Sequence, residues 1–230
     1  MVYNLKIKNP ATIAIFGATG SGKTFFVFEI LKNSKLLFEN PNCALPENTF
    51  IFYKLWTKEY ENNKHLISSN NWFQEKPTRQ KIEEIATFKS LDHGSTVIID
   101  DYQQNLDADI IDVFSVLSHH LNITVIILLQ SLFPTQSKLS CLREIIRNIH
   151  HSILFEQKRD QNQLIHLASQ IFPRNRQYFY DVLDFIYKSK KFSYVWIDTS
   201  PYQDSILKLR TNILPSEYPI SVFLPSKNKK

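Results

Sequence analysis

The chain has 230 residues, 43% of them hydrophobic and 13% aromatic, which is ample apolar material for one packed domain and argues against disorder. No run approaches the roughly 20 apolar residues of a membrane span, and the N-terminus lacks a signal-peptide pattern, so we expect an intracellular protein without a membrane partner. The net charge of +5 and the pI near 9.0 permit contact with a polyanion, although an ordinary solvated surface explains them equally well. The two cysteines, Cys43 and Cys141, indicate neither a disulfide framework nor a cysteine metal site, which favours a reducing compartment.

Short apolar runs and helical patterns alternate along the chain and predict a mostly parallel sheet with helices on both faces. The predicted strands are 12–16, 49–53, 96–99, 123–129 and 152–155, with a late strand at 192–197. The predicted helices are 25–33, 110–120, 139–148, 160–171 and 176–189. Pro173 and an asparagine separate the last two helices, because they break helix periodicity.

No internal repeat, low-complexity tract or Gly/Ser linker divides the chain, so we expect a single domain over 1–230. Within it we expect an N-terminal arm (1–10) followed by a nucleotide-binding core (11–172). A C-terminal helix and strand extension (173–225) and a basic tail (226–230) complete the chain.

Glycine is scarce in this chain, and three of its four glycines lie in one short segment between a predicted strand and a predicted helix. This segment matches the phosphate-binding pattern G-x-x-x-x-G-K-[ST] at every fixed position. It consists of Gly17, Ala18, Thr19, Gly20, Ser21, Gly22, Lys23 and Thr24. Backbone N–H groups and the helix N-terminus then converge on one anion, Lys23 reaches the β- and γ-phosphates, and Thr24 ligates Mg²⁺. The motif predicts a P-loop NTPase of the RecA-like type that uses ATP and Mg²⁺.

Two adjacent carboxylates end the predicted strand 96–99. A Mg²⁺ ion held by one hydroxyl and two phosphates needs a carboxylate nearby, and Asp100 is placed to supply it. Asp101 then polarises the attacking water as a general base. The alternative is that both acids merely cap the following segment.

The long interval between Lys23 and Asp100 leaves room for another strand to insert between theirs, and 123–129 is the natural candidate. Gln130 follows that strand and is predicted to sense the γ-phosphate or orient water, although a plain surface glutamine fits equally well.

Hydrolysis also needs cationic stabilisation of the transition state, which ring ATPases commonly take from an arginine of a neighbouring subunit. Arg143 and Arg147 lie one turn apart on the predicted helix 139–148, and each is a candidate. A solvated helix face remains the alternative. The histidine pairs at 119–120 and 150–151 are interpreted as structural, because adjacent histidines point to different faces.

Beyond the phosphate loop, several stretches resemble the genome-packaging ATPases of the FtsK–HerA superfamily, in particular those of polinton-like and adintovirus-type DNA viruses and, more distantly, the poxvirus packaging ATPase. The stretches are IFYKLWTKEYE (51–61), VIIDDYQQN (97–105), SHHLNITVIILLQSLFP (118–134), IRNIHHSILFEQKRDQNQLIHLASQIFP (146–173) and YVWIDTSPYQDSILKLRTNILP (194–215). The resemblance implies that Gln130 is the superfamily's amide and that Arg147 completes the neighbour's site. Many members have glutamate at the position of Asp101, so the resemblance does not assign the water-activating carboxylate.

The resemblance further implies a ring oligomer that threads double-stranded viral DNA into a capsid. Such a ring would act in an infected cell, either in the nucleus or in a cytoplasmic virus factory. Its protein partner would be a capsid or portal vertex protein. Candidate DNA contacts are the basic residues Arg174, Arg176, Lys188, Lys190 and Lys191. Three alternatives remain open: another nucleic-acid ATPase such as a helicase, a small-molecule kinase, and a nucleotide-dependent interaction module. The interval from Lys23 to Asp100 is longer than superfamily 3 helicases normally have, and no arginine-bearing lid of a kinase is evident.

Overall fold

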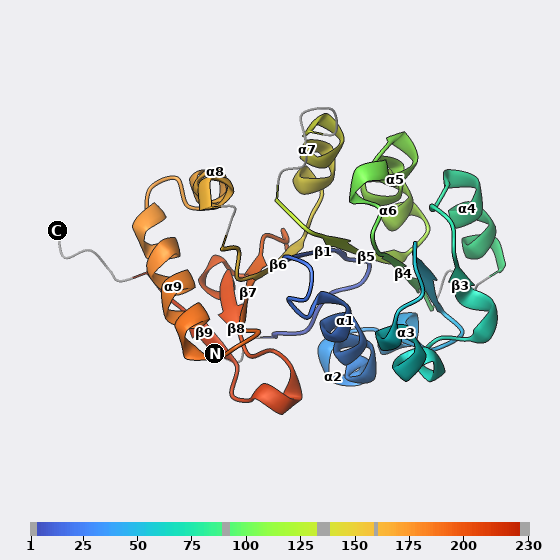
Figure 1. Cartoon of the computed structure of the whole chain (residues 1–230), viewed down its shortest axis with the longest axis horizontal. Coiled ribbons are helices and arrows are strands. Elements are labelled where there is room, and N and C mark those ends of the chain that lie inside the picture. Colours follow the sequence, from blue (N-terminus) through green and yellow to red (C-terminus); the bar gives the residue numbers. More distant parts are fainter. Residues whose placement is uncertain (1–3, 89–92, 133–138, 159–160, 226–230) are drawn as a thin grey trace.

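The computed structural model describes residues 4–88, 93–132, 139–158 and 161–225, and within them one nine-stranded sheet runs through the molecule (Figure 1). The strands are β1 (Thr12–Phe16), β2 (Thr49–Phe52), β3 (Trp72–Phe73), β4 (Ser95–Ile99), β5 (Ile123–Leu129), β6 (His151–Phe155), β7 (Tyr194–Asp198), β8 (Leu209–Thr211) and β9 (Ser221–Phe223). Their order is β3-β2-β4-β5-β1-β6-β7-β8-β9. The pairs among β1 to β6 are parallel and the pairs from β6 to β9 are antiparallel, which confirms the predicted mostly parallel α/β class.

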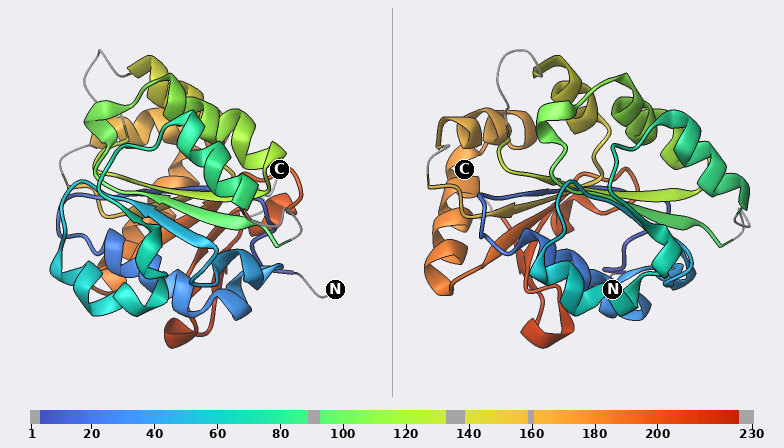
Figure 2. Two further views of the ribbon diagram at one scale, coloured as in Figure 1. Left: turned by 90° about the vertical axis from the view of Figure 1, so that its right-hand side faces the viewer. Right: turned by 45° about the vertical axis from the view of Figure 1, so that its right-hand side comes forward.

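Helices cover both faces of this sheet, as the edge-on views of Figure 2 show. The helices are α1 (Lys23–Lys32), α2 (Ser34–Leu37), α3 (Lys58–Asn63), α4 (Arg79–Phe88), α5 (Ala108–Asp112), α6 (Ser118–His120), α7 (Leu139–Arg147), α8 (Gln161–Ile171) and α9 (Arg176–Ser189). A π-helical turn, Val113–Leu117, joins α5 to α6. Helices α1, α2 and α3 lie on one face, and α4 to α7 lie on the other (Figure 1).

The alternation of side chains along each strand divides the core between the two faces. In β1, Ile13 and Ile15 pack with the residues of α1 and α2, whereas Ala14 and Phe16 pack with those of α4, α5 and α7. All five residues of β1 are buried, and so are all seven of β5, which is why these strands read as continuous apolar runs. The central strands are therefore held from both sides, and their ends are rigid supports for the loops that follow.

Six elements were missing from the sequence prediction: α2, α3, α4, β3, β8 and β9. Helix α4 is rich in charged residues, and only Ile82, Ile85 and Ala86 are buried among its described side chains, so its apolar stripe is narrow. The three strands have two or three residues each and carry no periodic signal of their own. The late strand begins at Tyr194 rather than at residue 192, because Phe192 has a left-handed backbone (φ 59°) that a strand does not accommodate.

Cys43 and Cys141 are both free thiols, and Cys43 is buried. Among the described residues, no helix combines the length and the apolar character needed to cross a bilayer. The predicted basic tail 226–230 lies outside the described residues.

Candidate nucleotide-binding site

The glycine-rich segment forms a tight loop between β1 and α1. The backbone N–H of Gly17 donates to the Leu129 carbonyl at 3.1 Å, so the loop starts from the β1–β5 ladder. Gly20 and Gly22 have φ angles of 78° and 95°, in the left-handed region that side chains with a Cβ rarely adopt. Gly22 is also the N-cap residue of α1, and the helix begins at Lys23. The loop therefore delivers the free N–H groups of a helix N-terminus to its own interior, which is the geometry for binding an anion.

Gly17 is required for a different reason, namely close approach. A Cβ at this position would lie 2.3 Å from Ser21 Oγ and 3.0 Å from Phe155 Cβ. The Ser21 hydroxyl is buried and has no hydrogen-bond partner within the described part of the chain. The loop thus closes on itself and leaves a polar atom inside that a ligand can satisfy.

The Lys23 ammonium lies on the backbone of the same loop. Its Nζ donates to the Gly17 carbonyl at 2.5 Å and to the Ala18 carbonyl at 3.1 Å. Burial lowers the pKa of Lys23, while the charges of Asp100 and Asp101 act in the opposite direction. The ammonium group is therefore held beside the loop, where it interacts electrostatically with both carboxylates.

Thr24 and Asp100 meet although they lie far apart in the chain, because β1 and β4 end at the same edge of the sheet. The Thr24 hydroxyl donates to Asp100 Oδ2 at 3.3 Å, and the Tyr60 hydroxyl donates to the same oxygen at 2.5 Å. Burial raises the pKa of the Asp100 carboxyl, and the hydrogen bond from Tyr60 opposes this rise. A hydroxyl and a carboxylate oxygen in contact are the hard donors that Mg²⁺ prefers, so Thr24 and Asp100 fit the predicted metal.

Tyr60 was not assigned a role from the sequence. It lies on α3, only 2% exposed, and its pKa is raised by burial and by Asp100. Its ring contacts Tyr53, Trp56 and Trp72, with centroid distances of 5.4, 5.8 and 5.6 Å. This aromatic cluster fixes the phenol against Asp100. A buried tyrosine at helical spacing from other aromatics resembles core packing, so no sequence signal distinguished it.

Asp101 and Gln130 also lie together, at the ends of neighbouring strands. Strand β5 is inserted between β1 and β4, as predicted, and Gln130 Nε2 donates to Asp101 Oδ1 at 3.3 Å. Both residues are exposed, and Asp101 has a left-handed backbone with φ 65°. That conformation turns the chain sharply after the strand and separates the exposed Asp101 from the buried Asp100.

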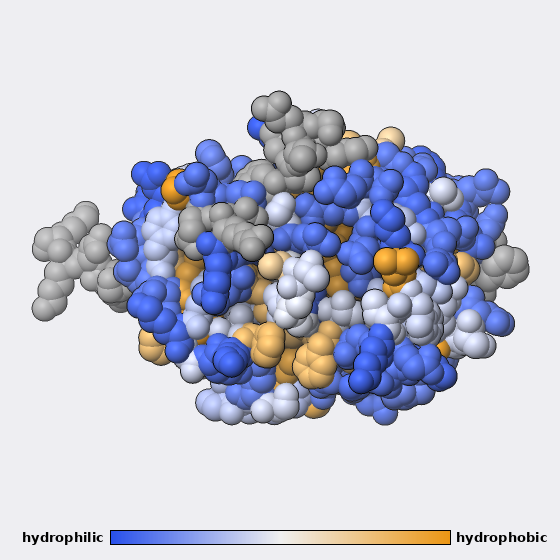
Figure 3. Space-filling model, in the orientation of Figure 1, coloured by the Kyte–Doolittle hydropathy of each residue, from blue (hydrophilic) through white to orange (hydrophobic). Residues whose placement is uncertain are grey.

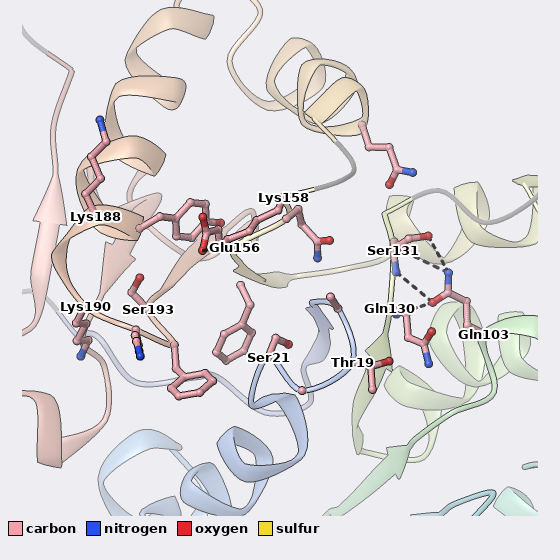
Figure 4. Close-up of a pocket in the computed structure, with 18 of the residues that line it drawn as sticks. Thr19, Ser21, Gln103, Gln130, Ser131, Glu156, Lys158, Lys188, Lys190 and Ser193 are labelled. Carbon is pink, nitrogen blue, oxygen red and sulfur yellow. Dashed lines mark hydrogen bonds and ion pairs between the residues drawn. The ribbon is translucent and has the colours of Figure 1, made fainter.

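Gln103 fixes the end of β5 and was likewise missed by the sequence prediction. Its Oε1 accepts from the backbone N–H groups of Gln130 and Ser131 at 2.5 and 3.3 Å, and its Nε2 donates to Ser131 Oγ at 3.0 Å (Figure 4). The side chain is 8% exposed. A buried glutamine thus holds the loop after β5 to the loop after β4, which keeps Gln130 next to Asp101.

A cavity of about 1150 Å³ opens over the phosphate loop. It is lined by backbone and side chains of the loop itself, by residues that follow β4, β5 and β6, and by the α9–β7 connection. In Figure 4, Thr19 and Ser21 lie between Gln130 and Ser131 on one side and Lys190 and Ser193 on the other. The face of the molecule drawn in Figure 3 is mostly hydrophilic, with apolar residues in small areas near its centre.

Three of the five predicted DNA contacts, Lys188, Lys190 and Lys191, line this cavity, whereas Arg174 and Arg176 do not. Lys188 pairs with Asp184 at 2.7 Å, and Lys190 pairs with Glu217 at 2.8 Å. The structure thus places three of the five cations around the cavity that opens over the phosphate loop.

The two candidate arginines do not line their own subunit's cavity. Arg147 ends α7, its guanidinium is exposed, and it pairs with Glu144 of the same helix at 2.8 Å. The chain then leads into the start of β6, where the backbone N–H of His150 donates to the Thr12 carbonyl. Arg147 therefore lies at the amino edge of the parallel strands, opposite the phosphate loop. Arg143 is exposed on the same helix.

The histidines at the amino edge enter structural contacts. His150 Nδ1 accepts from the Thr12 N–H at 3.3 Å, and the rings of His119 and His150 lie 5.5 Å apart. His151 is buried beside Asp198, whose Oδ2 accepts from Arg210 Nη2 at 2.5 Å. Among the described residues, no group of three or more His, Cys, Asp or Glu side chains is arranged to hold a metal ion.

Neither a model of a known protein family nor a curated protein matches this sequence. Solved structures to which this chain is similar include two ATPases of bacterial secretion systems. A prototypical ATPase of the type III secretion system of pathogenic bacteria has 11% identity and a TM-score of 0.39, covering 67% of this chain and 53% of its own. The cytoplasmic domain of the Thermomonospora curvata type VII secretion ATPase EccC has 8% identity and a TM-score of 0.47, covering 95% of this chain and 24% of its own. This chain thus spans about half of the first protein and about a quarter of the second, and neither likeness assigns it a family or an activity.

Proposed function

We propose that this chain is an ATPase that binds MgATP at the loop Gly17–Thr24 and hydrolyses it. The observation that carries the proposal is the 3.3 Å contact between Thr24 Oγ1 and Asp100 Oδ2, which joins the phosphate loop to the end of the acidic strand. An ordinary glycine-rich turn has no reason to meet a buried carboxylate in this way. The long-range contact therefore favours a nucleotide site over an incidental sequence match.

Each residue then has a definite task. The loop N–H groups and Lys23 hold the phosphates, and Lys23 exchanges its two backbone carbonyl partners for phosphate oxygens. Asp101 accepts the proton of the attacking water, and Gln130, already bonded to Asp101, orients that water. Thr24 and Asp100 hold Mg²⁺, which when bound neutralises the charge that develops on the phosphates.

We further propose that hydrolysis drives the translocation of double-stranded DNA, and that the task is packaging viral genomic DNA into a preformed capsid. The resemblance of five long stretches to genome-packaging ATPases supports this finer function. The cations Lys188, Lys190 and Lys191, which line the cavity, suit a phosphate backbone contacted without sequence readout. In this proposal the protein acts in an infected cell, as a ring, at the capsid or portal vertex.

Arg147 serves a neighbouring subunit in this proposal. Its position at the amino edge keeps it from its own phosphate loop, so a catalytic role requires a second copy of the chain. A ring of copies that places one subunit's amino edge against the next subunit's cavity supplies that arrangement.

The test of the proposed function is the rate of ATP hydrolysis with and without long duplex DNA. We expect DNA to stimulate the wild type, and Lys23→Ala to abolish both basal and stimulated rates. Lys32→Ala is the matched control, because Lys32 ends the same helix and pairs with Glu29 at the surface. Phosphate transfer to a metabolite without any effect of DNA would favour a kinase. Unchanged biological activity in a variant without turnover would favour an interaction module.

Subunit mixing tests the trans arrangement. Arg147→Ala and Lys23→Ala subunits are each expected to be inactive alone, and their mixture is expected to recover part of the activity, because some interfaces contain one intact copy of each site. An inactive mixture of subunits shown to co-assemble would remove Arg147 from the mechanism, and the same experiment with Arg143→Ala would then test the other candidate.

A further inference from the structure

Phe192 is a large apolar side chain left exposed at the phosphate loop. It is 66% exposed and lines the cavity. A Cβ at Gly22 would lie 3.8 Å from Phe192 Cδ1, so the ring stands beside the N-terminus of α1. An exposed phenylalanine forfeits the hydrophobic free energy that burial of its ring would supply. Its position next to a phosphate-binding loop suggests that a ligand covers it.

The backbone of Phe192 is held in a costly conformation. Its φ of 59° lies in the left-handed region, which is an outlier for a bulky residue. Such conformations persist only where the surroundings impose them, and they concentrate at ligand sites. The strain therefore needs anchors on both sides of the residue.

Both anchors are present. On the N-terminal side, Lys190 Nζ donates to Glu217 Oε1 at 2.8 Å and to Asn212 Oδ1 at 3.0 Å. On the C-terminal side, Tyr194 is 1% exposed and its hydroxyl donates to Glu217 Oε2 at 2.5 Å. The same carboxylate thus fixes both flanks, and Phe192 is displayed between them on a preorganised turn.

Buried aromatic packing also holds the turn against α1, the helix that follows the phosphate loop. Tyr194 packs on Phe26 of α1 with ring centroids 4.4 Å apart, and Phe155 lies 5.7 Å from Phe26 and 5.8 Å from Tyr194. The position of the turn relative to α1 therefore does not depend on the ligand. It is set by a buried aromatic cluster that includes the end of β6 and the start of β7.

The position of the turn fits one end of a nucleotide. Strand β5, which Gln130 directly follows, lies on one side of β1, and β6 and β7 lie on the other. In Figure 4, Gln130 is on the far side of the loop residues Thr19 and Ser21 from Lys190 and Ser193, the residues that bracket Phe192 within its turn. A nucleotide whose terminal phosphate faces Asp101 and Gln130 extends its base toward this turn. We propose that Phe192 is the platform on which the base of the bound nucleoside triphosphate stacks, an inference that rests on the proposed nucleotide site.

A platform of this kind recognises the π-face of the ligand and not its hydrogen-bonding edge. Stacking on an aromatic side chain is available to every base and discriminates little among them. The site is therefore expected to bind ATP and GTP with affinities within a few-fold of each other through this contact. Its ligand class is a nucleoside triphosphate in which the base supplies affinity and the phosphates supply the chemistry.

The experiment measures the binding of MgATP and of magnesium tripolyphosphate, which lacks the base, by calorimetry. Phe192→Ala is expected to weaken MgATP binding about tenfold and tripolyphosphate binding less than twofold. Because alanine also has a Cβ, it retains much of the energetic cost of the left-handed backbone at this position. The difference between wild type and Phe192→Ala therefore reports on the loss of the ring. Phe192→Tyr is expected to restore MgATP affinity. The control is Phe185→Ala, because Phe185 is also 66% exposed but lies on α9 against Phe223 and outside the cavity.

Two outcomes would overturn the platform while leaving the nucleotide site in place: equal weakening of both ligands, which indicates that the loop was disturbed, or no change in either. Weaker binding of duplex DNA by Phe192→Ala with unchanged MgATP affinity would also overturn it, in favour of a DNA contact. If the wild type binds neither MgATP nor tripolyphosphate, the proposed function fails and the platform fails with it.

Discussion

The polar and charged side chains at the two edges of the parallel strands have different surroundings. At the carboxyl edge, Lys23 has backbone carbonyls as its hydrogen-bond acceptors, and the hydroxyl of Ser21 is buried without a partner in the described chain. At the amino edge, the side chains of Asp198 and Arg210 are 2% and 3% exposed and form an ion pair at 2.5 Å, and the Nε of Arg210 has no hydrogen-bond partner within the described chain. The carboxyl edge holds polar groups that face the nucleotide cavity, and the amino edge holds a buried ion pair formed between two strands of the fold.

This difference between the edges predicts that substitutions at the carboxyl edge affect function and that substitutions at the amino edge affect stability. A charge removed from the amino edge leaves its partner buried and unpaired, so the folded state itself is weakened. A charge removed from the carboxyl edge deletes an interaction that forms fully only with nucleotide and magnesium bound. Four predictions test this contrast, from the largest expected effect to the smallest.

Arg210→Met is expected to lower the free energy of unfolding by about 3–5 kcal/mol, because it leaves the Asp198 carboxylate buried without its cation. Denaturant unfolding measures this change. Lys188→Met is the control, since the pair Lys188–Asp184 is exposed and such pairs contribute less than about 1 kcal/mol. The double variant Asp198→Asn with Arg210→Met is expected to recover part of the loss. An Arg210→Met variant as stable as the wild type would contradict a stabilising role of the buried Asp198–Arg210 pair.

Asp101→Asn is expected to lower the rate of ATP hydrolysis by about 10²–10³-fold, because an amide does not accept the proton of the attacking water. Affinity for MgATP is expected to stay within about twofold. Asparagine tolerates the left-handed backbone of this position (φ 65°), so the strand end keeps its shape. Asp181→Asn, at an exposed carboxylate on α9, is the control. Turnover at the wild-type rate would assign the general base to another group.

The free energy of unfolding is expected to fall by about 2 kcal/mol between pH 7.5 and pH 5 on account of His151. Burial lowers the pKa of His151 to about 4, whereas an unfolded histidine titrates near 6.5. Between these values the unfolded chain takes up a proton that the folded chain refuses, so stability is complete above about pH 6.5 and is lost as the pH falls toward 4. His151→Gln is expected to flatten this dependence in denaturant titrations at several pH values. An equally steep dependence in the variant would show that other groups cause it.

Tyr60→Phe is expected to raise the magnesium concentration for half-maximal ATPase activity about fivefold, which corresponds to about 1 kcal/mol for one lost hydrogen bond. The phenol orients Asp100 through the 2.5 Å contact, and phenylalanine keeps the aromatic packing without it. Tyr102→Phe is the control, because that buried hydroxyl donates to the Tyr53 carbonyl and not to an acid. If both variants respond alike, Tyr60 acts through packing alone.

Much of the site was predictable because its first half is contiguous. The loop Gly17–Thr24 carries its whole pattern within eight neighbouring positions, and the apolar runs on either side indicate the strand and helix that it joins. Asp100 and Gln130 were predictable for a related reason, since each directly follows a buried strand, and parallel strands end at one edge. The roles of Asp101, Gln130 and Arg147 stay predictions until activity is measured.

By itself, therefore, the sequence determined the parallel core, the phosphate loop and the strand ends that face it, because local pattern and strand order suffice for these. Only the tertiary structure decided that Tyr60 orients Asp100, that Gln103 ties the loops after β4 and β5 together, and that Phe192 stands beside Gly22. It also revealed the antiparallel strands β8 and β9, which are too short to produce a recognisable strand pattern in the sequence. These features depend on contacts between segments distant in the chain, and such contacts leave no local period or spacing to read.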